Sequence, residues 1–472
     1  MAHYERLSAL DAMFLGIEDE NCHMHIAATL VFDGEPLRDA EGRLDVERIR
    51  TYLQSRLHLV PRYRQRLAYI PYQRHPVWID DARFNIFYHV RHAALSPPAS
   101  DQRLKRLLGR ILSEKLDRTK PLWEIWIVEG LPGGRVAMVA KAHHAMVDGI
   151  SGMGLLTALL SPAPDAAFAP GPAWAPRARP SAARLVADEA WRRGVAVMDT
   201  ARLAAQAALR PWAVIGPLVD TMRGMADVVG AGAGAASVTP LNPPIGPHRR
   251  YDWVRFDLEH VKAVKRALGG TVNDVVLATV AGAVRRFLLK RSVLPDGLDF
   301  RVLVPVSLHA AGEQGVVGNH VANMIARLPV GGADIEARYH GILDHMQTLK
   351  RSAQVRGGQL LEAFADRFAP SVLASIVQFA LSGLTYNLVV TNVPGPQTPL
   401  YLLDAPLREF YPTVPLFRNQ GLGLALFSYA GGLYWGLNAD WDALPDVHDF
   451  TAALTQEFGA LREVAHRRTA AA

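Results

Sequence analysis

The chain of 472 residues contains one cysteine, Cys22. A single cysteine cannot form an internal disulfide bond or supply a cysteine-rich metal site, and its scarcity fits a reducing compartment. The sequence also has no GxxxxGK[ST] loop, no GxGxxG loop between a strand and a helix, and no GxSxG turn. Nucleotide hydrolysis, dinucleotide redox chemistry and a hydrolase-type serine nucleophile therefore lack their usual sequence signals.

Long apolar runs are scarce as well. The N-terminus, MAHYERLSALDAMFL, carries acidic residues early and has no apolar run followed by a small-residue cleavage site, so we expect no signal peptide. Residues 371–393 contain no charged side chain, but polar residues interrupt them. We interpret this segment as a buried helix that turns into a buried strand at 388–391, and not as a transmembrane helix. The expected location is the cytoplasm.

The composition is that of a globular protein with a large core. Half of the residues are hydrophobic, one fifth are charged, and Lys plus Arg exceed Asp plus Glu by 51 to 45. A chain of this length suits two domains of ordinary size. The small positive excess permits attraction to an anionic membrane surface or to a phosphate-bearing ligand, and we expect no nucleic-acid partner.

The pattern along the chain divides it into three parts. Residues 1–160 alternate strand-like and helix-like runs, which indicates an α/β domain. Residues 161–250 form a linker that begins proline-rich, continues as an Ala/Arg-rich helical stretch from about 181 to 225, and ends in glycine and proline. Residues 251–472 begin with a strand followed by a helix and form a second α/β domain.

The segment KAHHAMVDGISG, residues 141–152, concentrates reactive side chains. The segment overlaps the end of a predicted strand, RVAMVAKAHHA (135–145), in which the period of two places His143 and His144 on opposite faces. This arrangement argues against a metal ion held by both histidines, and we expect no metal site. Asp148 and Gly149 follow where the strand should turn into a helix. An imidazole at such a turn is suited to moving a proton near neutral pH. The alternative is two partly buried strand histidines followed by an ordinary turn.

HHAMVDG also matches the HHxxxDG active-site motif of the CoA-dependent acyltransferase superfamily. The whole chain resembles the bacterial wax ester synthase/diacylglycerol acyltransferase family, through stretches that include LSALDAMFL (7–15), MHI (24–26), PLWE (121–124), TVNDVVLA (271–278) and NVPGP (392–396). The sequence departs from the family pattern at three places: Thr391 stands where serine is frequent, PLYLLDA (399–405) lacks a glycine, and Leu308-His309 replace an arginine. These departures bear on which acceptor alcohol the protein would prefer.

The resemblance implies a fold and a reaction. The fold would be α/β, with two chloramphenicol-acetyltransferase-like domains, mixed sheets and an active-site tunnel at their interface. His144 would be the general base that deprotonates a lipid hydroxyl as it attacks acyl-CoA, the co-substrate, directly and with no bound cofactor. The acceptor would be diacylglycerol, giving triacylglycerol, or a fatty alcohol, giving a wax ester. His143 would be a support, Asp148 would orient the turn, and Gly149 would form it.

Further candidates lie in the other matching stretches. Asn273 is a candidate donor to the oxyanion or an orienter of His144, because an amide donates without changing charge. The alternative is that Asn273 or Asp274 caps the following helix. Trp123 either lines a substrate channel or belongs to the strand core. A further group would form a fixed turn at a strand end, with a tunnel wall as the alternative: Asn392, Pro394 and Gly395.

Two other functions share this pattern. Condensation domains of peptide synthesis also carry HHxxxDGxS, but their donor rides on a carrier protein, and the sequence shows no carrier segment. A non-catalytic lipid-droplet coat protein would use the Ala-rich region 183–236 as an amphipathic helix on a lipid surface. For the enzyme itself we expect peripheral contact with the inner membrane face or with lipid droplets, because its substrates are insoluble.

Overall fold

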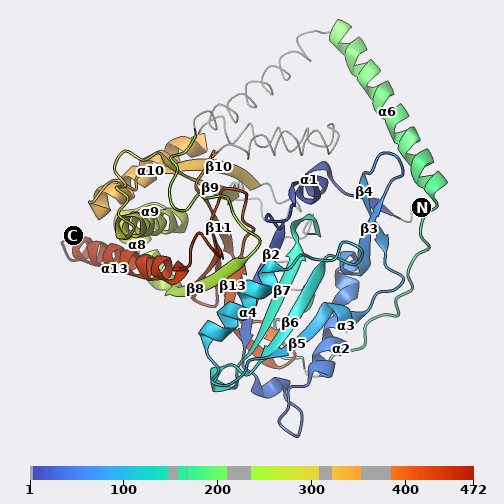
Figure 1. Cartoon of the computed structure of the whole chain (residues 1–472), viewed down its shortest axis with the longest axis horizontal. Helices are drawn as coiled ribbons and strands as arrows, with labels where there is room; N and C mark the ends of the chain where they lie inside the picture. Colours follow the sequence, from blue (N-terminus) through green and yellow to red (C-terminus); the bar gives the residue numbers. More distant parts are fainter. Residues whose placement is uncertain are drawn as a thin grey trace.

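The computed structural model describes residues 4–146, 158–165, 167–209, 235–307, 321–351 and 384–471. This part of the chain folds into two α/β bodies, each built on a six-stranded mixed sheet, with a small three-stranded sheet beside the first (Figure 1). The mixed α/β architecture with two sheet-containing domains confirms the expected fold class. Two separate hydrophobic cores, one over each large sheet, hold most of the buried apolar side chains.

The first large sheet has the strand order β12-β13-β2-β7-β6-β5. Its strands are β2 (His25–Phe32), β5 (Val90–Ala94), β6 (Trp123–Glu129), β7 (Val136–His143), β12 (Tyr401–Leu402) and β13 (Ala405–Thr413). β7 is central and buried along almost all of its length, which explains why its sequence VAMVAKAH is mainly apolar on both faces. Antiparallel pairing of β2 with β7 places His25 opposite His143.

The last third of the chain completes this first sheet. β13 pairs antiparallel with β2, from Leu407 opposite Phe32 to Thr413 opposite Ala27, with a bulge before Glu409. The segment expected to form the C-terminal domain, 251–472, thus contributes two strands to the sheet of the N-terminal domain. The sequence pattern did not reveal this exchange, because alternation in a strand reports burial and not the identity of the partner strand.

The second large sheet has the order β10-β9-β11-β14-β15-β8. Its strands are β8 (Arg249–Asp257), β9 (Phe300–Ser307), β10 (Val321–Leu328), β11 (Leu388–Pro394), β14 (Leu422–Tyr429) and β15 (Gly432–Asp440). β11 runs parallel to both neighbours, and the other pairs are antiparallel. The strand predicted at 388–391 is confirmed as β11. The helix predicted before it falls within 352–383, outside the described residues.

In the described part of the chain, four helices gather on one side of the second sheet (Figure 1): α8 (Leu258–Leu268), α9 (Val272–Lys290), α10 (Ile335–Arg351) and α13 (Val447–Ala471). Asp257 is the N-cap of α8, and its carboxylate accepts two backbone N–H groups. Gly269, with a φ of 84°, is the C-cap. Thr271 is the N-cap of α9 and forms a capping box with Asp274. The alternative that Asn273 or Asp274 is the N-cap is therefore wrong: Asp274 is the third residue of the helix.

The remaining elements surround the two bodies. The helices are α1 (Ala9–Ile17), α2 (Val46–Arg56), α3 (Ile86–His89), α4 (Asp101–Ser113) and α6 (Ala182–Leu209). The small sheet contains β1 (Glu5–Arg6), β3 (Gln65–Tyr69) and β4 (Pro76–Asp80). Short 3-10 turns are η1 (Glu35–Leu37), η2 (Leu57–Leu59), η3 (Pro61–Arg64), η4 (Pro132–Gly134) and η5 (His144–Met146).

The proline-rich segment after residue 160 is held against the first body. Trp174 packs edge-on against Phe84 at 6.3 Å between ring centroids, and Arg177 makes a two-pronged contact with Asp80. The helix that follows, α6, is anchored at its start by the buried Leu185 and then stands away from both sheets (Figure 1). The helix predicted from 181 is present over 182–209, and its predicted continuation to 225 lies outside the described residues.

The two bodies meet where α4 packs against β8. A Cβ atom on Gly109 of α4 would lie 2.6 Å from the backbone oxygen of Arg249, so only glycine allows this approach. The Arg249 guanidinium is buried and donates to the carbonyl groups of Gly246 and Asn21. Arg249 is therefore part of the interface and the first residue of β8, although the predicted linker, 161–250, includes it.

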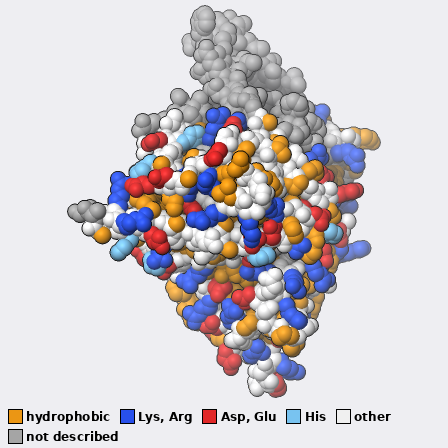
Figure 2. Space-filling view, turned by 60° about the vertical axis from the view of Figure 1, so that its left-hand side comes forward, with side chains coloured by type: hydrophobic (Ala, Val, Ile, Leu, Met, Phe, Trp, Pro, Cys, Tyr) orange, Lys and Arg blue, Asp and Glu red, His pale blue; other side chains and the backbone are white. Residues whose placement is uncertain are grey.

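Within the described ranges, no single helix is both long and apolar enough to cross a membrane. The pair α8 and α9 passes such a test only jointly, and the two helices are bent by 95°. On the face seen in Figure 2, Lys and Arg side chains alternate with Asp and Glu, and neither sign dominates.

We expect Gly109→Ala to destabilise the contact between the two bodies. The added methyl group meets backbone, which cannot rotate away, and overpacking of this kind costs about 1–3 kcal/mol. Gly459→Ala is the matched control, because Gly459 also lies in a helix and a Cβ there meets nothing within 4 Å. Calorimetry should show a lower melting temperature for Gly109→Ala and an equal or higher one for the control. An unchanged melting temperature for Gly109→Ala would contradict this packing.

Candidate functional site

The two histidines of the HHxxxDG motif lie at the end of β7 and differ in environment. His143 is the last strand residue and is almost fully buried, with 1% of its surface exposed. His144 opens the 3-10 turn η5, and its backbone N–H donates to the carbonyl oxygen of Met24 at 2.8 Å. Its ring lies against Phe14 of α1, with 4.0 Å between ring centroids. His144 as a whole residue is half-buried.

The protonation state of His144 suits a base. Burial, together with the neighbouring His143, lowers the pKa of the His144 imidazole to about 4. The ring is therefore neutral at physiological pH and offers a lone pair. In the described part of the chain, no other residue hydrogen-bonds its ring nitrogens. Asp148 and Gly149 belong to the segment 147–157, outside the described residues.

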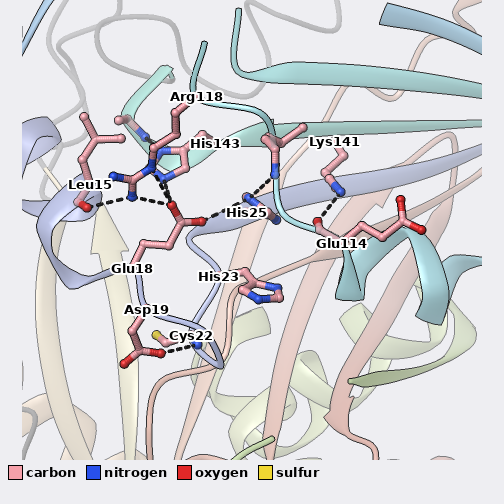
Figure 3. Close-up of polar contacts among 12 residues, drawn as sticks. Leu15, Glu18, Asp19, Cys22, His23, His25, Glu114, Arg118, Lys141 and His143 are labelled. Carbon is pink, nitrogen blue, oxygen red and sulfur yellow. Dashed lines mark hydrogen bonds and ion pairs between the residues drawn. The ribbon is translucent and has the colours of Figure 1, made fainter. Parts of the chain in front are cut away.

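A buried carboxylate lies beside this turn (Figure 3). Glu18 follows α1, and its side chain is 6% exposed. Its two oxygens lie 3.4 Å from Nε2 of His25 and 3.6 Å from Nε2 of His143. Arg118 reaches the same carboxylate through Nε at 3.0 Å and donates through Nη2 to the carbonyl of Leu15 at 2.8 Å. Three cationic or polar partners thus converge on Glu18.

The electrostatics of this cluster keep Glu18 charged. Burial alone would raise the pKa of Glu18, but its contacts with His143 and His25 hold that pKa well below its usual range. Burial lowers the pKa of His25 to about 3, so that ring is neutral. Nδ1 of His143 accepts the backbone N–H of Ala145 at 3.1 Å. The cluster therefore connects Glu18 to the turn that carries His144.

Sequence reasoning did not single out Glu18, His25 or Arg118. The signal was present in part, because LSALDAMFL and MHI were recognised as family stretches and Glu18 lies between them. The pairing of β2 with β7 brings these segments together, and that pairing was not visible from the sequence.

The cysteine is not placed for nucleophilic catalysis. Cys22 is buried, its thiol lies 3.2 Å from the carbonyl oxygen of Leu416, and burial raises its pKa to about 12. A thiol with such a pKa is almost entirely protonated at neutral pH and is a poor nucleophile. Among the described residues, no group of His, Cys, Asp and Glu side chains is arranged to hold a metal ion.

The other candidates lie in different surroundings. Trp123 is buried, its Nε1 donates to the carbonyl of Tyr63 at 2.8 Å, and its ring stacks on His89 at 4.4 Å. These contacts favour the strand-core alternative over a channel wall. Asn273 lies partly buried in the first turn of α9. No contact among the described residues joins it to the His144 turn.

The NVPGP segment contains the end of β11: Asn392 and Pro394 belong to the strand itself, so the predicted turn is wrong for these two residues, and only Gly395 lies after the strand. Asn392 and Pro394 are the last residues of β11 in register with β14, opposite Leu426 and Ser428. The N–H of Gly395 donates to the Ser428 hydroxyl at 3.2 Å, and a Cβ on Gly395 would lie 2.3 Å from the Ser428 backbone oxygen. Glycine is required here by close packing, as the fixed-turn interpretation expects.

Comparison with known proteins places this geometry in a family. A family model described as the wax ester synthase/diacylglycerol acyltransferase catalytic domain matches residues 7–276, and a model of the WS/DGAT C-terminal domain matches residues 317–462. The first match extends beyond the expected domain boundary at 160 and includes both His144 and Asn273.

Relatives of known name match over nearly the whole chain. A putative diacylglycerol O-acyltransferase of Mycobacterium tuberculosis is 34% identical over 456 residues, covering 94% of this chain and 88% of the relative. A probable diacylglycerol O-acyltransferase of the same species is 31% identical over 467 residues, covering 98% and 96%.

Solved structures agree. A wax ester synthase/diacylglycerol acyltransferase from Marinobacter aquaeolei VT8 has a TM-score of 0.69 at 26% identity, covering 98% of this chain and 100% of that one. The first condensation domain of the calcium-dependent antibiotic synthetase has a TM-score of 0.57 at 16% identity, covering 98% and 96%, and shares the fold. The family models, the relatives and the Marinobacter structure together show that the chain belongs to the wax ester synthase/diacylglycerol acyltransferase family.

Proposed function

We propose that this protein transfers a long-chain acyl group from acyl-CoA to a lipid hydroxyl. The observation that carries the proposal is the neutral imidazole of the half-buried His144 at the end of β7, within a chain of this acyltransferase family. Diacylglycerol is the acceptor that we favour, because the relatives from Mycobacterium tuberculosis are named for it. A fatty alcohol is the second acceptor, supported by the name of the Marinobacter structure.

The reaction proceeds by direct transfer in this proposal. His144 takes the proton of the acceptor hydroxyl while that oxygen forms a bond to the thioester carbonyl carbon. The tetrahedral intermediate then collapses, the C–S bond breaks, and the imidazolium returns the proton to the CoA sulfur. The products are the ester and free CoA. An acyl-enzyme on Cys22 is not needed, and burial with a raised thiol pKa disfavours it.

Other residues take supporting roles in the proposal. Asp148 orients the turn, and Gly149 lets the chain turn closely. Asn273 is the candidate donor to the oxyanion, a role in which one well-placed donor contributes about 2.7–4 kcal/mol. Its side chain is in the first turn of α9, where helix N–H groups also favour negative charge. Asn392, Pro394 and Gly395 hold the end of β11, and Trp123 supports the strand next to β7.

Contact with a lipid surface completes the proposal. The acceptors are insoluble, and α6 exposes Trp191 at 78%, Val195 at 37% and Met198 at 53%. Spacings of four and three residues put these three side chains on one face of the helix. Arg192 and Arg193 follow Trp191 in the sequence, but both are paired with the buried carboxylate of Glu189, so the apolar face alone supports this part of the proposal.

His144→Ala should lower kcat by about 100- to 10,000-fold, because general-base assistance contributes that much. The measurement is the release of CoA from long-chain acyl-CoA in the presence of diacylglycerol or hexadecanol, detected with a reagent that reacts with the free thiol of CoA. His448→Ala is the control, since His448 is an exposed histidine of the second body. Equal activity of His144→Ala and wild type with both acceptors would sink the proposed mechanism, and carrier-bound substrates would then be tested.

The pH profile should show the lowered pKa of His144. A base must be unprotonated, and the His144 pKa of about 4 keeps it so above that value. We expect kcat/KM to be nearly level between about pH 8 and 6 and to fall only as the pH approaches 4, whereas an unperturbed histidine would lose half its activity near 6.5. Chromatographic measurement of the ester product covers this range. An acid limb centred at 6.5 would contradict the environment described for His144.

Trp191→Ala should weaken binding to anionic vesicles at low salt. Loss of one inserted large apolar side chain should lower the partition coefficient by about tenfold. Leu294→Ala is the control, because Leu294 is an equally exposed apolar residue, 75% exposed, on the second body. If wild type does not co-sediment with phosphatidylglycerol vesicles, or if both variants bind equally to wild type, contact through α6 is excluded.

A further inference from the structure

Glu18 is close to the site but is not placed to touch a substrate. Its carboxylate is 6% exposed and is surrounded by His25, His143 and Arg118 (Figure 3). A buried carboxylate is costly unless it is fully paired, so its retention next to a reactive turn calls for a physical reason. The reason lies in His143, the first histidine of the motif.

The hydrogen bonds of His143 determine where its proton is. Nδ1 accepts the N–H of Ala145, so Nδ1 carries no proton, and the N–H group of the ring is on Nε2. Nε2 faces the Glu18 carboxylate at 3.6 Å and has no other partner in the described part of the chain. A negative oxygen at this position favours the Nε2–H tautomer over the alternative, which would turn an N–H group against the N–H of Ala145.

His25 does not have the same constraint. Its Nε2 lies 3.4 Å from Glu18 and also 3.4 Å from the backbone nitrogen of Leu116, so the Glu18 carboxylate and the Leu116 N–H group compete for this one ring nitrogen. Arg118 is 37% exposed and is tied to Leu15, so it neutralises the charge of Glu18 from the solvent side. Of the three partners, only His143 also hydrogen-bonds the turn η5, through the N–H of Ala145.

Two hydrogen bonds then fix the backbone on both sides of the His144 side chain. The N–H of His144 is bound by Met24, and the N–H of the next residue, Ala145, is bound by His143. With both amides held, the Cα–Cβ direction of His144 is set, and its ring lies against Phe14. A misplacement of about 1 Å at a catalytic group costs about 100-fold in rate.

We propose that Glu18 is a positioning residue that acts through His143: it holds the His143 ring in the Nε2–H tautomer, so that Nδ1 binds the Ala145 N–H and directs His144 toward the acceptor hydroxyl. This inference rests on the proposed function of His144 as the general base. It assigns a chemical reason to the first histidine of HHxxxDG, whose ring is too deeply buried to meet a substrate.

The first test compares two neighbouring carboxylates. Glu18→Gln removes the charge with little change in shape and should lower kcat by about 10- to 100-fold, with KM within about twofold of wild type. Asp19→Asn is the matched control: Asp19 belongs to the same loop, but it accepts the N–H groups of Asn21 and Cys22 and pairs with Arg418. Equal kcat for Glu18→Gln and wild type would overturn the proposal.

The second test asks whether the effect passes through His143. In His143→Asn, the amide oxygen replaces Nδ1 as acceptor for Ala145, whereas His143→Ala has no acceptor. We expect His143→Asn to keep at least about tenfold more kcat than His143→Ala. Adding Glu18→Gln to His143→Asn should then cost less than twofold. A full, additive loss in the double variant would show that Glu18 acts by another route.

A measurement without substrate separates this inference from the proposed reaction. In protein labelled with ¹⁵N-histidine, long-range ¹H–¹⁵N correlation reports the tautomer of His143, identified by the signal that His143→Asn removes. We expect Nε2–H in wild type and in Asp19→Asn, and a mixture or the other tautomer in Glu18→Gln. Nδ1–H in wild type would refute the positioning role even if the enzyme is an acyltransferase. If Glu18→Gln does not fold, the pair His143→Asn and His143→Ala decides.

Discussion

The antiparallel pairing of β2 with β7 is the contact on which the candidate site depends. It sets His25 opposite His143 and brings the carbonyl of Met24 to the N–H of His144. The register cannot slip by one residue without turning every core side chain of both strands to the opposite face. The burial of Leu30, Phe32, Val136 and Met138 therefore fixes the position of the reactive turn indirectly. The position of His144 is therefore determined by the packing of core side chains that take no part in the chemistry.

A second constraint comes from the charge at the centre of the site. Glu18 is ionised inside the protein, and its partners come from three separate parts of the chain: β2, the end of β7 and the segment after α4. The same loop reaches the second body, where Arg249 binds the carbonyl of Asn21 and Cys22 lies against Leu416. The geometry around His144 is thus connected to the interface between the two bodies, where this fold family is expected to bind its substrates.

The sequence predicted what local patterns and motifs can encode. HHxxxDG with PLW, TVNDVVLA and NVPGP led to the family. The succession of strand-like and helix-like runs predicted the α/β class, the period of two predicted β7, and the uncharged apolar run at 388–391 predicted β11. It could not reveal Glu18, because a carboxylate after a helix is ordinarily solvated and becomes special only through strand pairing. It also misplaced the cap of α9, since Thr271, Asn273 and Asp274 are all competent caps and the choice depends on the turn at Gly269 and Gly270. Arg249 resembled a linker end because burial between two bodies leaves no periodic signature.

The course of β13 has a consequence for biosynthesis. During translation, β2 emerges from the ribosome early, but its neighbour on one side is encoded almost four hundred residues later in the chain. Until residues 405–413 are made, β2 has an open edge with unpaired backbone groups, which is a site for wrong association between chains. The N-terminal half of the nascent chain therefore stays partly folded, or has its open strand edge covered, until β13 has been synthesised. The complete first sheet therefore forms only after synthesis has passed residue 413.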